Sequence, residues 1–141
     1  MFVQQLNDCL NVHTKRTGEN VMERNVLPHD HGQNEGKILE KLPTVDECRM
    51  VADIFKQISD GTRLRILWFL CHCEECVSNI AAAMEMSDPA VSHHLRTLKN
   101  TGLIVSRREG KEIYYKLADT PVAEHIHHMC EEIFHITCPL E

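Results

Sequence analysis

Apolar positions recur at helical spacing after Pro43 and predict the first pair of helices. The first helix begins at Thr44, which forms a capping-box pattern with Glu47. Asp60 is placed to cap the second helix. The apolar positions lie three and four residues apart, as on one helix face. They are Val51, Ile54, Phe55 and Ile58 in the first helix, and Leu64, Leu67, Trp68 and Cys71 in the second.

A short helix, a tight turn and a second helix follow over residues 77–102. The short helix is expected from about Ser78 to Met84. Ser87 is a good N-cap for the next helix, and Pro89 falls in its first turn, where the missing N–H does no harm. Gly102 is a suitable stop. The buried stripe of this helix is Val91, Leu95 and Leu98, and the pattern predicts a helix-turn-helix whose second helix lies in the DNA major groove.

The spacing then changes from helical to alternating. The β-prone runs Leu103–Arg108 and Glu112–Leu117 flank Glu109-Gly110-Lys111, which predicts a hairpin with a glycine turn. A last helix is expected from Asp119 to about His135, with Val122, Ile126, Met129, Ile133 and Ile136 as its apolar stripe. The predicted fold is therefore a mainly α winged helix-turn-helix of about five helices and one β-hairpin.

Composition and length restrict the class of protein. The chain has 141 residues, of which 43% are hydrophobic and 26% charged, as in a globular protein. We expect a flexible N-terminal arm over residues 1–42 and one domain over residues 43–138. The longest apolar run, Ile66–Cys71, is too short to span a membrane, and the N-terminus lacks a signal-peptide pattern. These features predict a cytoplasmic protein, and the absence of a Gly-rich phosphate loop or catalytic triad order argues against an enzyme.

Charge is distributed unevenly. The net charge is −6, yet residues 85–116 carry six Lys/Arg and four acidic residues. A locally basic surface on an acidic body can still bind DNA. A solvated charged face on a three-helix core is the alternative, but the basic hairpin follows the second helix directly. The expected DNA-contacting residues are Ser87, Pro89, Ala90, Ser92, His93, Arg96 and Thr97, with Arg107, Arg108 and Lys111 on the wing.

The same residues carry a family resemblance over roughly residues 44–135. The runs 60–67, 87–99, 107–111 and 114–119 resemble the ArsR/SmtB family of winged-helix metal-sensing repressors. The resemblance implies a homodimer built on the first and last helices. It also implies that the metal-free protein binds double-stranded operator DNA and releases it when metal binds.

Seven cysteines are unusual in a small cytosolic chain and favour metal or redox chemistry over disulfides. Cys73 and Cys76 have the spacing of a zinc-binding half-site, whereas Cys71 fits the core of the second helix. Cys76 falls at the first cysteine of the family's Glu-Leu-Cys-Val-Cys-Asp motif, and Ser78 replaces the second. The resemblance implies further ligands from the arm of the other subunit, for which His29 and His31, or Cys9 and His13 farther out, are candidates.

A second candidate site lies on the last helix. The family pattern there has Asp-x-His followed by His-x-x-Glu or His; Asp119, Glu132 and His135 match three positions, and Pro121 occupies the fourth. A shifted set that uses His125 or His128 with His135 and Cys138, or an ordinary solvated face, is the alternative. The candidate ligands are Asp119, His125, His128, Glu132, His135 and Cys138.

These features together predict a metal-responsive transcriptional repressor. Mixed His and Cys ligands favour zinc, and a dominant cysteine site would favour cadmium or lead. Two alternatives remain: a repressor of the same fold in which Cys73 and Cys76 form a thiol redox switch, and a metal-buffering protein. The expected partners are double-stranded operator DNA, a second copy of the chain and the metal ion.

Overall fold

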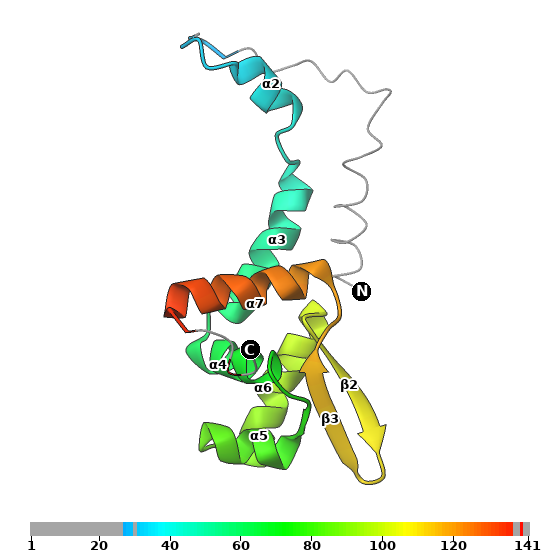
Figure 1. Cartoon of the computed structure of the whole chain (residues 1–141). Coiled ribbons are helices and arrows are strands. Elements are labelled where there is room, and N and C mark those ends of the chain that lie inside the picture. The colour runs from blue at the N-terminus through cyan, green and yellow to red at the C-terminus, as the bar shows by residue number, and fades with distance from the viewer. Residues whose placement is uncertain (1–26, 30, 137–138, 140–141) are drawn as a thin grey trace.

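The computed structural model describes residues 27–29, 31–136 and 139. Within them the chain forms six helices and a three-stranded antiparallel sheet, which confirms the winged helix-turn-helix. Figure 1 shows the helices with the long β-hairpin projecting from them. Helix α2 and strand β1 were not predicted, so the expected number of five helices was one too low for this part of the chain. The elements are α2 (Glu35–Glu40), α3 (Val45–Ile58), α4 (Gly61–Leu70), β1 (Glu75–Cys76), α5 (Val77–Met84), α6 (Asp88–Thr101), β2 (Ile104–Glu109), β3 (Glu112–Leu117) and α7 (Pro121–Phe134).

Side-chain caps fix where the helices begin. Thr44 and Glu47 form the predicted capping box of α3. Asp60 accepts a hydrogen bond from the Arg63 amide at 2.8 Å and starts α4. Thr120, rather than Asp119, caps the last helix by accepting from the Ala123 amide at 3.3 Å. This cap moves the start of α7 two residues beyond the predicted position.

The wing is a β-hairpin with a third, short strand at its base. The sheet order is β1-β3-β2, and the register runs from Ile104 opposite Leu117 to Glu109 opposite Glu112. Gly110 at the turn has φ +60, a conformation that glycine adopts at little cost. Strand β2 begins and ends one residue later than predicted. Strand β1 pairs with β3 through its two residues and attaches the cysteine-rich segment to the base of the wing. It was not predicted because a strand of two residues is too short to show an alternating pattern.

The core lies where α3 and α4 meet α5, α6, the base of the wing and one face of α7. The predicted stripe of α6 is confirmed, because Val91, Leu95 and Leu98 are completely buried. In α4 the predicted Leu67 is buried, but Ile66 and Leu70 are also buried. The predicted positions Leu64, Trp68 and Cys71 are only half-buried.

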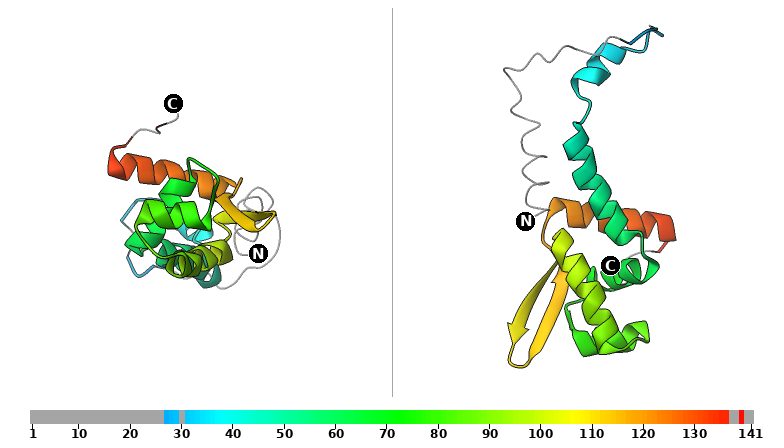
Figure 2. Two further views of the ribbon diagram at one scale, coloured as in Figure 1. Left: turned by 90° about the horizontal axis from the view of Figure 1, so that it is seen from below. Right: turned by 180° about the vertical axis from the view of Figure 1, so that it is seen from behind.

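The predicted apolar stripe of the last helix was correct only in part for the single chain: Ile126 is buried and Val122 packs against the core. The buried residues of α7 are Ala123, Ile126 and Cys130, whereas Ile133 is 65% exposed and Ile136 is also exposed. Helix α3 likewise leaves Val51 and Phe55 exposed, and it extends away from the rest of the body (Figure 2). Helical spacing identifies an apolar face, but it does not say whether that face packs within one chain or remains available to a partner.

Candidate nucleic-acid interface and metal centre

The tight turn between α5 and α6 sets the orientation of the second helix. Glu85 ends α5 in the left-handed conformation, with φ 58, and the Met86 amide donates to the Ala81 carbonyl at 2.9 Å. Ser87 then caps α6 through the Ala90 amide at 3.4 Å. These contacts reverse the chain within three residues and hold α6 against the core along its apolar side.

The polar side of α6 faces solvent. Of the residues predicted to contact DNA, Ser87, Pro89, His93 and Arg96 are exposed, and Ala90, Ser92 and Thr97 are half-buried. The Thr97 hydroxyl donates to the His93 carbonyl at 3.2 Å and so stays on the helix surface. The exposed side therefore offers an arginine, an imidazole and small polar groups, which suit base edges and phosphates.

The wing extends from the same body, and its basic side chains have different partners. Arg107 donates to the carboxylates of Glu74 and Glu109, and its guanidinium lies 4.8 Å from the centre of the Tyr114 ring. The hydrogen bonds to Glu109 and Glu74 raise the pKa of Arg107. Arg108 is exposed and donates to the nearby Gly110 carbonyl at 3.1 Å. Arg108 and the exposed Lys111 are thus the cations presented at the tip of the wing.

The predicted cysteine site is not assembled within the described residues. Cys73 and Cys76 are half-buried, and the Cys73 thiol donates to the Phe69 carbonyl at 3.4 Å. Burial raises the pKa of Cys73, and the charge of Glu75 raises it further. His29 and His31 are exposed, with ring centres 6.3 Å apart. Over residues 27–29, 31–136 and 139 these four side chains do not form a cluster of three ligands. Cys9 and His13 lie outside the described residues.

The predicted last-helix ligands are separated along α7. Asp119 precedes the helix, while His135 ends it with φ 52. A helix of 14 residues is about 21 Å long, so one chain cannot bring the two ends to one ion. His125, His128 and Glu132 are exposed along α7, and Cys138 lies outside the described residues.

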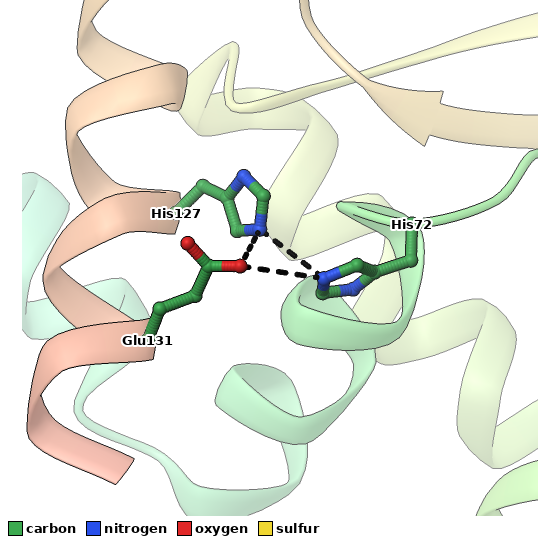
Figure 3. Close-up of side chains that lie close together, drawn as sticks. All are labelled: His72, His127 and Glu131. Carbon is green, nitrogen blue, oxygen red and sulfur yellow. Dashed lines mark hydrogen bonds and ion pairs between the residues drawn. The ribbon is translucent and has the colours of Figure 1, made fainter. Parts of the chain in front are cut away.

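A different cluster does converge within one chain. His72, just beyond α4, meets His127 and Glu131 of α7 (Figure 3). The His127 Nε2 atom lies 3.2 Å from His72 Nε2 and 3.0 Å from Glu131 Oε1, and His72 Nε2 lies 3.7 Å from the same Glu131 oxygen. None of these three residues was among the metal ligands predicted from the sequence. The His-x-x-x-Glu spacing of His127 and Glu131, which puts them on one helix face, was the available signal.

The fold and the exposed face of α6 define a winged-helix DNA-binding protein, and comparison with known proteins assigns its family. Residues 60–106 match the bacterial regulatory proteins of the arsR family. The chain is 37% identical over 95 residues to a transcriptional repressor SmtB homolog of Synechocystis sp., covering 67% of this chain and 72% of that protein. It is 44% identical over 85 residues to a cadmium resistance transcriptional regulatory protein CadC homolog of Staphylococcus aureus, covering 60% of this chain and 67% of that protein. The chain belongs to the arsR family, whose members are transcriptional regulators rather than enzymes.

Solved structures agree with this assignment. A homodimeric winged helix-turn-helix DNA-binding domain from Mycobacterium bovis superimposes with a TM-score of 0.55 at 27% identity. The match covers 76% of this chain and 90% of that chain. None of the helices in the described part of the chain has the length and apolar character needed to cross a bilayer.

Proposed function

We propose that this protein is a metal-responsive repressor that binds double-stranded operator DNA in its metal-free form and releases it when a metal ion binds. The observation that carries the proposal is the pairing of an exposed, capped α6 with a wing whose tip presents Arg108 and Lys111. The first element is suited to the major groove and the second to the phosphate backbone. The family assignment and the relatives named as repressors support the same function.

The repressor is proposed to act as a homodimer in the cytoplasm. Phe55 on α3 and Ile133 and Phe134 on α7 are large apolar side chains that the single chain leaves exposed. A second copy would cover them and would present two α6 helices to a palindromic site. The related Mycobacterium bovis domain, which is homodimeric, supports this arrangement.

Zinc is the proposed effector, with cadmium or lead favoured if thiolates dominate the site. The first predicted set, Cys73 and Cys76 with His29 and His31 of a partner, remains a proposal. So does the set on α7 (Asp119, His125, His128, Glu132, His135 and Cys138), which needs ligands from both copies because the helix separates its ends. Burial raises the pKa of Cys73, which disfavours the thiolate that a redox switch would use at this position.

The test uses reduced, metal-free, full-length protein. Duplexes that the protein selects from a random DNA pool serve as the probe, and binding is followed by fluorescence anisotropy with and without zinc chloride. We expect tight binding without metal and an affinity at least tenfold weaker with zinc. Arg96→Ala should abolish selective binding while leaving the circular dichroism spectrum unchanged.

Two results would contradict the proposal. Failure of the metal-free protein to select any sequence would favour a metal-buffering role. Release of DNA by a thiol oxidant, with no effect of zinc, cadmium or lead, would favour the redox switch.

A further inference from the structure

Three side chains from two separate elements place their donor atoms around one point. The ligand atoms of His72, His127 and Glu131 lie 3.0, 3.2 and 3.7 Å apart. Zinc bonds to nitrogen and oxygen are about 2.0–2.1 Å long, so tetrahedral ligand atoms are separated by roughly 3.3–3.4 Å. The observed separations lie on both sides of this value. An ion would therefore fit among these atoms with only small side-chain movements.

The surrounding hydrogen bonds direct lone pairs toward that point. His72 Nδ1 lies 2.8 Å from the Trp68 carbonyl, which can only accept, so Nδ1 carries the proton and Nε2 offers its lone pair. Glu131 Oε1 is buried and has no hydrogen-bond partner of good geometry among the described residues. Neutral His127 with its proton on Nδ1 would offer the third lone pair from Nε2. A hydrogen bond to a backbone carbonyl, like the one between His72 and Trp68, orients the histidine ligands of many metal sites.

We propose that His72, His127 and Glu131 form a divalent metal site within one chain. Two imidazoles and one carboxylate favour zinc or a neighbouring first-row ion over the thiophilic cadmium and lead. The three side chains are only 8%, 16% and 16% exposed, which restricts access of water to the ion. A simple His127–Glu131 ion pair would not require a second imidazole with its Nε2 atom 3.2 Å away.

The position of this site in the fold gives it a role in regulating DNA binding. This role rests on the proposed repressor function. His72 lies between α4 and β1, and β1 pairs with the wing strand β3 and runs directly into α5. His127 and Glu131 lie on α7, which carries the exposed apolar residues proposed for the dimer contact. A metal ion bound by His72, His127 and Glu131 would connect the segment before α5 to α7, the helix proposed to form part of the dimer contact.

The test is a titration of reduced, metal-free, full-length protein with cobalt(II) chloride, followed by absorbance. For this site we expect one ion per chain with tetrahedral ligand-field bands and no sulfur-to-cobalt charge-transfer band. His127→Gln and Glu131→Gln should each weaken binding by more than about 100-fold, since even outer contacts contribute 10–100-fold. His72→Gln provides the same test from the other element. Glu124→Gln, which changes an exposed carboxylate on α7 that belongs to none of the proposed ligand sets, is the matched control and should leave the affinity unchanged.

Thermal melts of the metal-free variants establish that each one folds. Unchanged cobalt affinity in His127→Gln and Glu131→Gln, a bound ion whose bands disappear in Cys73→Ser, or no binding at all would overturn the site. The two proposals also fail differently. Cobalt binding that needs His127 but does not alter DNA affinity would refute the repressor function, whereas metal-induced DNA release that persists in His127→Gln would refute this site.

Discussion

The Ser78 hydroxyl on α5 donates a hydrogen bond to the Asp88 carboxylate in the first turn of α6, with 2.8 Å between Oγ and Oδ2. This bond directly joins the first turn of α5 to the first turn of α6. Ser78 stands where the resemblance places the second cysteine of the family's metal motif. In this chain the position holds the orientation of α6 and cannot supply a thiolate.

Replacing Ser78 with alanine should therefore affect DNA binding more than stability. We expect Ser78→Ala to lower the free energy of unfolding by about 0.5–1 kcal/mol, as for an ordinary hydrogen bond at the surface. DNA affinity should fall because α6 loses a contact that fixes its angle. Urea denaturation and anisotropy measure the two effects. Ser59→Ala, which removes a hydroxyl bond to the Lys56 carbonyl at the end of α3 and no hydrogen bond to α6, is the control and should leave DNA affinity intact. Equal DNA affinity in both variants would contradict the role of Ser78.

The basic residues of the wing should contribute unequally to DNA binding. Arg108→Ala and Lys111→Ala should each reduce the slope of log affinity against log salt concentration by about 1, because each removes one phosphate contact. Arg107→Ala should change the slope less, since its guanidinium is already paired with Glu74 and Glu109. Anisotropy titrations at several salt concentrations measure these slopes. If Arg107→Ala changed the slope most, the pairing would not persist on DNA.

The exposed apolar residues of α3 and α7 should control the oligomeric state. Phe55 is 50% and Ile133 is 65% exposed in the single chain. Phe55→Ser and Ile133→Ser should shift the protein from dimer to monomer in sedimentation velocity experiments, because each removes apolar area from the contact. Val105→Ser provides the control: Val105 is an exposed apolar residue on the wing strand β2. A control variant that dissociates as readily as the other two would argue against a contact through α3 and α7.

The thiols should differ in reactivity. Cys48 is exposed on α3, whereas Cys73 is half-buried and burial raises its pKa. Only the thiolate reacts with iodoacetamide, so Cys73 should be alkylated more slowly than Cys48 near neutral pH. Mass spectrometry of peptides from timed reactions of metal-free protein gives both rates. Faster alkylation of Cys73 would bring the redox switch back into consideration.

Local patterns and long-range contacts were not equally predictable from the sequence. The stripe of α6 and the glycine turn of the wing follow from periodicity and turn chemistry within a few residues, and both could be predicted. The contact between His72 and His127 joins residues 55 positions apart and depends on how α7 packs against the end of α4. No local pattern contains that information. The exposure of Ile133 was missed for a related reason. Helical spacing shows that apolar residues recur along α7, but it does not show which of them pack within the chain.

The Asp60 cap should make the free energy of unfolding depend on pH under acidic conditions. It caps α4 through the Arg63 amide, and this hydrogen bond lowers the pKa of Asp60, with smaller contributions from the charges of Arg63 and His94. A carboxyl whose pKa is lower in the folded state stabilises the protein when ionised, and the contribution is lost as pH falls through that folded pKa. We expect Asp60→Ala to lower the free energy of unfolding by about 1 kcal/mol near pH 7, as for other lost N-caps.

The difference between wild type and Asp60→Ala should shrink as pH falls below the ordinary aspartate pKa of about 3.9 and through the lower pKa of the folded state, where the wild-type carboxyl takes up a proton. Asp60→Asn separates capping from charge, because asparagine also caps helices but does not titrate. Its free energy of unfolding should stay close to wild type near pH 7 and should lack the Asp60 part of the acid dependence. Denaturant titrations of the three proteins at matched pH values measure these differences. A gap between wild type and Asp60→Ala that stays constant down to pH 3 would show that the cap acts without its charge.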